Sequence, residues 1–288
     1  MSPRRSSAPD AEIFPFLKWA GGKGRLLPEL ERRFPKSFSV YHEPFLGAGA
    51  VFFRLVQGLK PARCWLGDLN ADLILAFQTV RDHTPRLIRE LTALREAHSK
   101  TSYYRARDEY NERGRDGDGV RRAALLIYLN KTGFNGLYRV NSRGEFNVPF
   151  GRYVKPSIFD PRALQATAAL LRKAEIADED FGSVLDRAQR DDFVYFDPPY
   201  DTLSRSASFT AYGSGGFGPD EQERLAEIFA KLARRKVRVM LSNHDTPLVR
   251  KLYEGFHIDA VSMQRLINSN PSLRSNVVGE VIVRSYKE

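Results

Sequence analysis

The chain has 288 residues, 42% of them hydrophobic, and its 45 Lys and Arg against 35 Asp and Glu give a formal net charge of +10. This length allows one large hydrophobic core or two modest ones, and the single Cys64 excludes an internal disulfide framework and a cysteine-based zinc site. The five histidines show no ligand spacing, so we expect no metal, and the basic excess suits either a polyanionic partner or a basic enzyme without one.

The first part of the chain predicts short strands that alternate with helices. Residues 1–12 are polar and predict a flexible arm without the apolar block of a signal peptide, and no apolar run reaches the length of a membrane span. We therefore expect a cytoplasmic protein. Strands are predicted in 38–45 and 63–68 and helices in 49–58 and 71–82, and this alternation indicates a parallel sheet.

The middle of the chain has a different pattern. From 85 to 131 the apolar residues recur with a helical period, and from 132 to 157 that period is lost among Gly, Asn, Arg, Pro and aromatic residues. The later predicted elements are strands at 191–197, 236–243, 256–263 and 277–286 and a helix at 219–235. The whole pattern predicts an α/β sheet interrupted by a helical insertion.

A glycine turn lies between the first predicted strand and helix. Gly47 and Gly49 would let a ligand approach the backbone there. Phe52 occupies the third glycine position of a dinucleotide fingerprint, which disfavours a nicotinamide cofactor. Asp68 ends the next strand and could accept ribose hydroxyls, so a nucleoside such as S-adenosylmethionine (AdoMet) fits. The alternative is a plain tight turn and a capping aspartate.

A second glycine-rich turn, KWAGGKGR, spans 18–25. It is not a phosphate-binding P-loop, because the first glycine of that motif would fall at Leu17. Lys23 and the backbone amides of this turn could bind a carboxylate. The alternative is a surface turn before a helix.

The motif DPPY (197–200) directly follows an apolar strand. Its two prolines stop the strand, restrict rotation and leave carbonyls without neighbouring N–H donors. Asp197 and the Pro198 carbonyl can accept both hydrogens of an exocyclic amine while Tyr200 stacks on the ring that carries it. The amine can then attack an electrophilic methyl group, and a base in duplex DNA must first be flipped out of the stack. The alternative is an Asp-Pro turn on an exposed loop.

Five motifs occur in the order FLKWAGGK, EPFLGAG, DLN, DPPY, SNHDT, and together they resemble the Dam-like (D12 class) N6-adenine DNA methyltransferases. The resemblance covers residues 14–285. It implies a Rossmann-like AdoMet-dependent methyltransferase sheet with an inserted, mainly helical DNA-recognition domain. By this resemblance, 13–82 and 158–288 form the catalytic domain, and 83–157 form the target-recognition domain with a DNA-reading hairpin at 131–153.

The resemblance also implies roles for individual residues. The catalytic residues are Asp197, Pro198, Pro199 and Tyr200. The AdoMet pocket consists of Trp19, Ala20, Gly21, Lys23, Glu43, Phe45, Gly47, Gly49, Asp68, Asp180 and Phe181. The residues expected to contact DNA are Lys18, Phe134, Asn135, Arg139, Arg152, Ser206 and Ser208. Arginine forks suit guanine, Phe134 suits a wedge in the base stack, and Arg139 matches the guanine-reading position.

The expected activity is therefore AdoMet-dependent methylation of adenine N6 in double-stranded DNA, and the reading segment matches recognition of GATC. A monomer associated with the nucleoid would suffice, and a cognate restriction nuclease is an open partner. The same motifs leave open methylation of N4-cytosine or of RNA adenine. A DNA-binding protein without catalysis is a further alternative, which the intact Asp197, Tyr200 and glycine turn disfavour.

Overall fold

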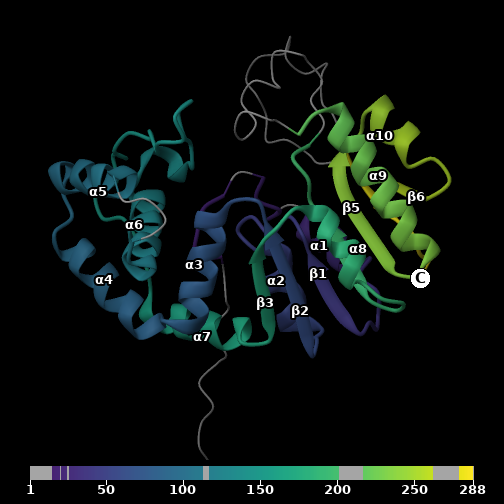
Figure 1. The fold of residues 1–288 in the computed structure, drawn as a ribbon, viewed down its shortest axis with the longest axis horizontal. Helices are drawn as coiled ribbons and strands as arrows, with labels where there is room; N and C mark the ends of the chain where they lie inside the picture. The colour runs from purple at the N-terminus through teal and green to yellow at the C-terminus, as the bar shows by residue number, and fades with distance from the viewer. Residues whose placement is uncertain are drawn as a thin grey trace, which may run out of the picture.

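A computed structural model describes residues 15–19, 21–24, 26–112, 117–200, 217–261 and 279–287. Its seven-stranded sheet has the order β3-β2-β1-β4-β5-β7-β6 (Figure 1). The strands are β1 (Val40–Glu43), β2 (Arg63–Asp68), β3 (Ala174–Asp178), β4 (Phe193–Phe196), β5 (Arg238–His244), β6 (His257–Val261) and β7 (Glu280–Arg284). All neighbours from β3 to β5 pair in parallel, whereas β7 is antiparallel to β5 and β6. The predicted α/β class and its largely parallel sheet are confirmed.

The central strand β4 is apolar along its whole length, because both faces of the sheet are covered there. All four residues of β4 are buried. Phe193 and Tyr195 of this strand belong to one apolar cluster, and Val194 and Phe196 belong to a second. Successive side chains of a strand point to opposite faces, so the two clusters are the cores on the two faces.

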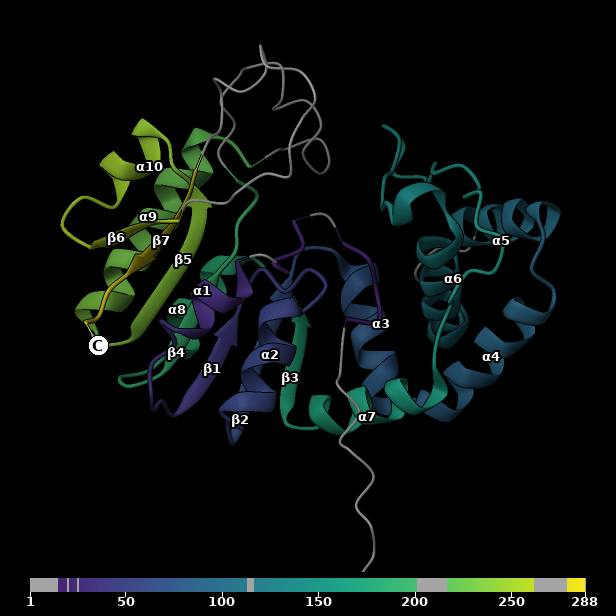
Figure 2. The ribbon, with the colours of Figure 1, turned by 180° about the vertical axis from the view of Figure 1, so that it is seen from behind.

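Helices cover both faces. The first cluster includes apolar residues of α1 (Leu27–Glu31), α2 (Ala50–Gly58), α3 (Ala71–Asp82) and α7 (Pro161–Leu171). The second includes those of α8 (Val184–Arg187), α9 (Pro219–Arg234) and α10 (Pro247–Leu252). Figure 1 shows α9 in front of β5, and Figure 2 shows α1 and α2 on the opposite face. No helix within the described residues is both long and apolar enough to cross a membrane.

Three further helices, α4 (Thr84–Glu96), α5 (Lys100–Glu112) and α6 (Gly119–Thr132), lie beside the sheet beyond α3 (Figure 1). The centre of α6 is buried at every position from 123 to 130, because α3, α4 and α5 all pack against it. These helices share one continuous apolar cluster with α1, α2 and α3. The division of the chain into two domains at 83 and 157 stays a prediction.

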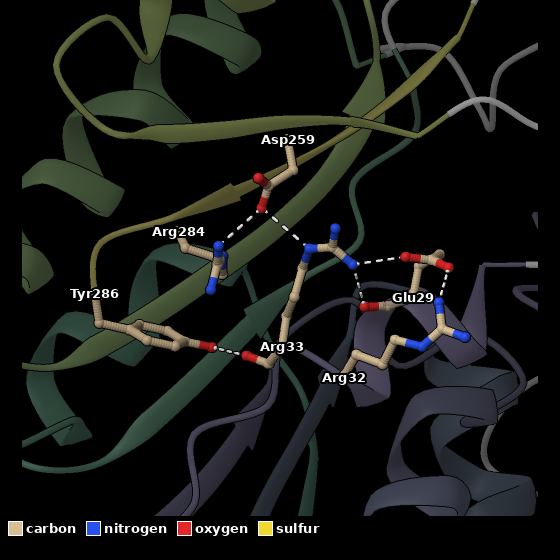
Figure 3. Close-up of polar contacts among 6 residues, drawn as sticks. All are labelled: Glu29, Arg32, Arg33, Asp259, Arg284 and Tyr286. Carbon is tan, nitrogen blue, oxygen red and sulfur yellow. Dashed lines mark hydrogen bonds and ion pairs between the residues drawn. The ribbon is translucent and has the colours of Figure 1, made fainter. Parts of the chain in front are cut away.

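A polar network anchors α1 to the last two strands, as Figure 3 shows. Asp259 of β6 accepts from Arg33 Nε at 3.0 Å and from the Arg284 guanidinium at 2.9 Å. The Tyr286 hydroxyl donates to the Arg33 carbonyl at 2.7 Å, and Arg33 also pairs with Glu29 at 2.8 Å. The network therefore joins the first helix of the described chain to its last strands.

Candidate active site

The sequence motifs meet at the carboxyl ends of the parallel strands. The chain runs from β1 outward to β2 and β3 on one side, and from β4 outward to β5 on the other. Loops that follow β1 and β4 therefore leave in opposite directions at the carboxyl ends of the strands, which is the usual ligand position in such sheets. Glu43 ends β1, Asp68 ends β2, Asp197 follows β4 and His244 ends β5.

The glycine turn between β1 and α2 needs its glycines. Gly47 has φ 50° and Gly49 has φ 72°, both in the left-handed region. A Cβ atom on Gly47 would lie 3.3 Å from the Trp19 ring, and one on Gly49 would lie 3.2 Å from the Phe53 ring. The turn is therefore specified by backbone conformation and by the aromatic rings packed against it.

Asp68 holds this turn in place. Its Oδ2 accepts the Gly47 N–H at 3.0 Å, and its Oδ1 accepts the Asn70 N–H at 2.9 Å. Burial raises the pKa of Asp68, and these two backbone bonds oppose the rise. The side chain expected to bind a ribose thus already orients the glycine turn, and each carboxylate oxygen has a further lone pair for a ligand.

Asp197 is the centre of the catalytic candidates. Its Oδ1 lies 2.8 Å from Lys23 Nζ and accepts from Ser242 Oγ at 3.0 Å. The Tyr195 hydroxyl bonds to the same Ser242 Oγ at 2.8 Å. Burial raises the pKa of Asp197, and the adjacent Lys23 opposes the rise. Two donors on Oδ1 fix the carboxylate plane and so direct Oδ2.

Lys23 lies against the catalytic candidates. It is only 7% exposed, and its Nζ donates to the Gly21 carbonyl at 3.0 Å and lies 4.3 Å from the centroid of the Tyr200 ring. The sequence placed Lys23 in the cofactor pocket. The structure brings it to Asp197, so it bridges the second glycine turn and DPPY.

Tyr200 lines a cavity of about 330 Å³ together with Gly21, Gly22, Lys23, Leu26, His244 and Glu280. Its hydroxyl donates to Glu280 Oε2 at 3.2 Å, and its ring packs edge-on against His244 with centroids 4.8 Å apart. Burial, with Asp197 and Glu280 nearby, raises the pKa of Tyr200. The Tyr200 ring therefore stays neutral and is held in place by Glu280 and His244.

Glu43 is buried, whereas Phe45 is half-buried. Glu43 is 2% exposed and accepts from the Tyr41 hydroxyl at 2.7 Å, and burial raises its pKa well above the usual value. Phe45 stacks on Phe181 with centroids 5.1 Å apart and meets Phe217 edge-on at 5.6 Å. Both side chains therefore have partners within the protein.

Asp180 and Phe181 are covered by an arginine that sequence reasoning did not select. Arg224 forms a two-pronged ion pair with the Asp180 carboxylate, with Nη1 3.0 Å from Oδ2, and its guanidinium lies 4.3 Å from the centroid of the buried Phe181 ring. Burial alone would raise the pKa of Asp180, but the bonds from Arg224 and the Gly182 N–H lower it overall.

The expected reading segment is less regular than a hairpin. It has two isolated antiparallel bridges, Gly133 to Phe150 and Val140 to Phe146, in place of two continuous strands. The left-handed backbone at Asn135, Gly136 and Gly144 interrupts regular pairing. Phe134, Asn135, Arg139 and Arg152 are exposed on it, as a surface that contacts DNA requires. Arg139 Nε donates to Asn147 Oδ1 at 2.7 Å.

The buried Asn130 ties this segment to the second glycine turn. Its Oδ1 accepts the Lys18 N–H at 2.8 Å, and its Nδ2 donates to the carbonyls of Lys18 at 2.7 Å and Gly136 at 3.0 Å. The Trp19 ring stacks on Tyr138 with centroids 4.9 Å apart. Lys18 Nζ lies 4.8 Å from the centroid of the Tyr153 ring. Ala20, Ser206 and Ser208 lie outside the described residues.

Five residues that hold the site together were not predicted from the sequence: Asn130, Ser242, Asn243, Gln222 and Arg224. SNHDT was noticed as a motif, but Ser242 and Asn243 received no role. Gln222 carried a usable signal, because it is a polar residue on the apolar face of α9, in helical register with Leu225 and Phe229. Among the described residues, no group of three or more His, Cys, Asp or Glu side chains is arranged to hold a metal ion.

The chain resembles several known proteins in sequence. A family profile described as D12 class N6 adenine-specific DNA methyltransferase matches residues 19–267. The chain is 42% identical to the Type II methyltransferase M.MjaIII of Methanocaldococcus jannaschii, over 96% of this chain and 100% of that protein. It is 41% identical to the DNA adenine methylase of Escherichia coli K12, over 91% of this chain and 92% of that protein. It is also 38% identical to the Type II methyltransferase M1.LlaDCHI of Lactococcus lactis, over 94% of this chain and 95% of that protein.

Proposed function

Because the chain belongs to the D12 class of N6 adenine-specific DNA methyltransferases, we propose that it methylates adenine within GATC in double-stranded DNA, on a base flipped into the cavity beside DPPY. The observation that carries this proposal is the partly buried Asp197 carboxylate, fixed through Oδ1 by Lys23 and Ser242 next to the Tyr200 ring. A carboxylate, a proline carbonyl and an aromatic face then surround the position of an exocyclic amine.

AdoMet fits the glycine turn that follows β1. The glycine turn brings backbone N–H groups to the start of α2, and each Asp68 oxygen accepts one backbone N–H and keeps a further lone pair for a ligand. Gly47, Gly49, Asp68 and the Asp180–Phe181 pair would hold the nucleoside. When bound, AdoMet supplies an electrophilic methyl group.

The protein's own groups orient and polarise the amine. In this proposal Asp197 Oδ2 and the Pro198 carbonyl accept the two amine hydrogens, and Tyr200 stacks on the adenine ring. These bonds increase electron density on N6 and align its lone pair with the methyl group. One amine proton leaves to solvent after transfer, so the site needs no strongly shifted general base. Orientation and hydrogen bonding would supply the rate enhancement.

The first test uses methyl-labelled AdoMet with two short duplexes, one that contains GATC and one with those four bases shuffled. We expect label only on the GATC duplex and N6-methyladenine after digestion to nucleosides. N4-methylcytosine in that digest would overturn the assignment of the base, and equal label on both duplexes would overturn GATC.

A pair of variants tests the catalytic assignment in the same assay. Asp197→Ala should abolish transfer without loss of AdoMet binding. Asp178→Ala is the matched control, because Asp178 ends β3 at the same edge of the sheet but is exposed. Undiminished turnover in Asp197→Ala would refute the assigned chemistry.

A further inference from the structure

We propose that Gln222 on α9 is a positioning residue for methyl transfer, which sets the geometry of the DPPY turn through the carbonyl of Pro199. This inference rests on the proposed function. Gln222 is fully buried. Its Nε2 donates to the Pro199 carbonyl at 3.1 Å, and its Oε1 accepts from Asn243 Nδ2 at 3.0 Å.

The direction of this hydrogen-bond chain is fixed at both ends. The His244 backbone N–H can only donate, and it donates to Asn243 Oδ1 at 2.8 Å. Asn243 must therefore present its NH2 group to Gln222 Oε1, which leaves the Gln222 NH2 group for Pro199. The Pro199 carbonyl can only accept. The orientation of both amides therefore follows from the backbone groups at the two ends.

The Pro199 carbonyl is an effective point from which to hold this turn. The rings of Pro198 and Pro199 already fix φ at both residues, and neither residue has an N–H with which to brace the turn. The remaining soft dihedral is ψ. A bond to the Pro199 carbonyl fixes ψ of Pro199 and hence the peptide plane that leads into Tyr200. Gln222 therefore sets how the Tyr200 ring is presented relative to Asp197.

Gln222 completes a set of contacts that begins on β5. Three consecutive residues of that strand each reach a different part of the turn: Ser242 bonds to Asp197, His244 packs on Tyr200, and Asn243 acts through Gln222 on Pro199. The SNH part of SNHDT thus has a physical role that the proposed chemistry did not require of it.

An apolar residue would suit the position of Gln222 if packing alone mattered. Its neighbours on the buried face of α9 are Leu225, Ala226 and Phe229. Burying an amide is unfavourable unless all its bonds are made. Both ends of the Gln222 amide are bonded here, and the group at one end belongs to the candidate catalytic turn.

The experiment compares Gln222→Met with Gln78→Met in the full-length protein. Gln78 on α3 is a matched control, because its Nε2 also links a helix to a backbone carbonyl, that of Ile176, at 2.8 Å but away from the site. In single-turnover assays with a GATC duplex, Gln222→Met should slow methylation at least about tenfold, because small misplacements of reacting groups are costly. The Kd values for DNA and AdoMet should stay at the wild-type level, and Gln78→Met should keep the wild-type rate.

Gln222→Glu preserves the side-chain shape and adds a readout that a packing role would not change. Burial raises the pKa of a carboxyl group, and the protonated acid can donate to the Pro199 carbonyl whereas the carboxylate cannot. The methylation rate of this variant, relative to wild type at each pH, should therefore rise as the pH falls.

Two results would overturn the inference: a wild-type single-turnover rate in Gln222→Met, or an equal slowing in Gln78→Met. A pH-independent ratio for Gln222→Glu would also count against it. A wild-type protein that forms no N6-methyladenine would instead refute the proposed function, so the two failures are distinguishable.

Discussion

Three acidic residues, Glu43, Asp68 and Asp197, lie at the carboxyl ends of the strands, and each has different hydrogen-bond partners. Asp68 is held by backbone amides, Glu43 by the Tyr41 hydroxyl, and Asp197 by the Lys23 ammonium and Ser242. Burial raises the pKa of each carboxyl, but of these three only Asp197 has a direct ion pair to favour its charged form. Asp197 is therefore best placed to accept a hydrogen bond as an anion.

The ion pair predicts a pH dependence. In the proposed mechanism Asp197 must be ionised to accept from the amine, so the transfer rate should fall as the pH drops through the pKa of Asp197. Lys23→Met removes the group that opposes the rise in the pKa of Asp197, and should move the acid limb of the single-turnover rate profile to higher pH. Glu280→Gln removes a negative charge that raises this pKa and should move the limb to lower pH. Shifts in the same direction for both variants would contradict this electrostatic account.

Sequence specificity gives a second residue-scale prediction. Arg139→Ala should reduce discrimination between GATC and a duplex with one guanine changed, because a bidentate arginine–guanine contact is worth about 1–3 kcal/mol. Competitive methylation of the two duplexes measures the ratio. Arg143→Ala is the control, since Arg143 lies in the same segment and is 78% exposed in its pair with Glu145. Equal loss of discrimination in the two variants would contradict a specific role for Arg139.

At the scale of elements, the spacing of hydrophobic residues and the turn-forming residues predicted most strands of the sheet. The continuous apolar runs of β4 and β5 were readable, because central parallel strands are buried on both faces. The strand β3 was missed, since AEIAD is short and exposes Glu175 at the sheet edge. The helix α7 was also missed, although Asp160 caps it and Pro161 begins it, a recognised start signal.

The site was predictable only in part, for a physical reason. DPPY and the glycine turn are local patterns whose chemistry can be read from neighbouring residues. The pairs Lys23–Asp197 and Asn130–Lys18 join residues more than 100 positions apart. Gln222 acts on Pro199 across 23 positions. Such partners are determined by tertiary packing, which the local hydrophobic pattern of a sequence does not reveal.

The anchor between α1 and the last strands predicts a loss of stability. Asp259→Ala leaves two half-buried guanidinium groups, those of Arg33 and Arg284, without their shared carboxylate. We expect the free energy of unfolding to fall by about 1–2 kcal/mol, because the Arg284 guanidinium loses this carboxylate, although Arg33 retains its pair with Glu29. Urea unfolding with an unchanged m value measures this loss. Arg63→Ala is the control: its pair with Glu175 is largely exposed, and its loss should cost less than about 1 kcal/mol. Equal losses would contradict a structural role for the anchor.

At the scale of the whole molecule, the charge becomes informative once it is combined with the fold. A net charge of +10 alone fitted many basic enzymes. In the structure, Lys18 and Lys131 adjoin the reading segment, and burial together with Lys18 lowers the pKa of Lys131 to about 8. Burial is the larger of the two causes, and a phosphate beside Lys131 would offset both. These two lysines therefore lie where a bound polyanion would reduce their mutual repulsion.

The affinity for a GATC duplex should fall steeply and linearly with salt on a log–log plot. Each neutralised phosphate releases counterions, and about six to ten contacts cost a factor of about 10³–10⁵ between about 50 and 200 mM salt. Arg152→Ala, on the exposed reading segment, should reduce the slope by about one unit. Arg172→Ala removes the same charge from the exposed C-terminal end of α7 and should leave the slope unchanged, which separates local phosphate contacts from net charge. Fluorescence anisotropy across a salt series measures both slopes. Equal reductions would mean that overall charge, and not the reading segment, governs binding.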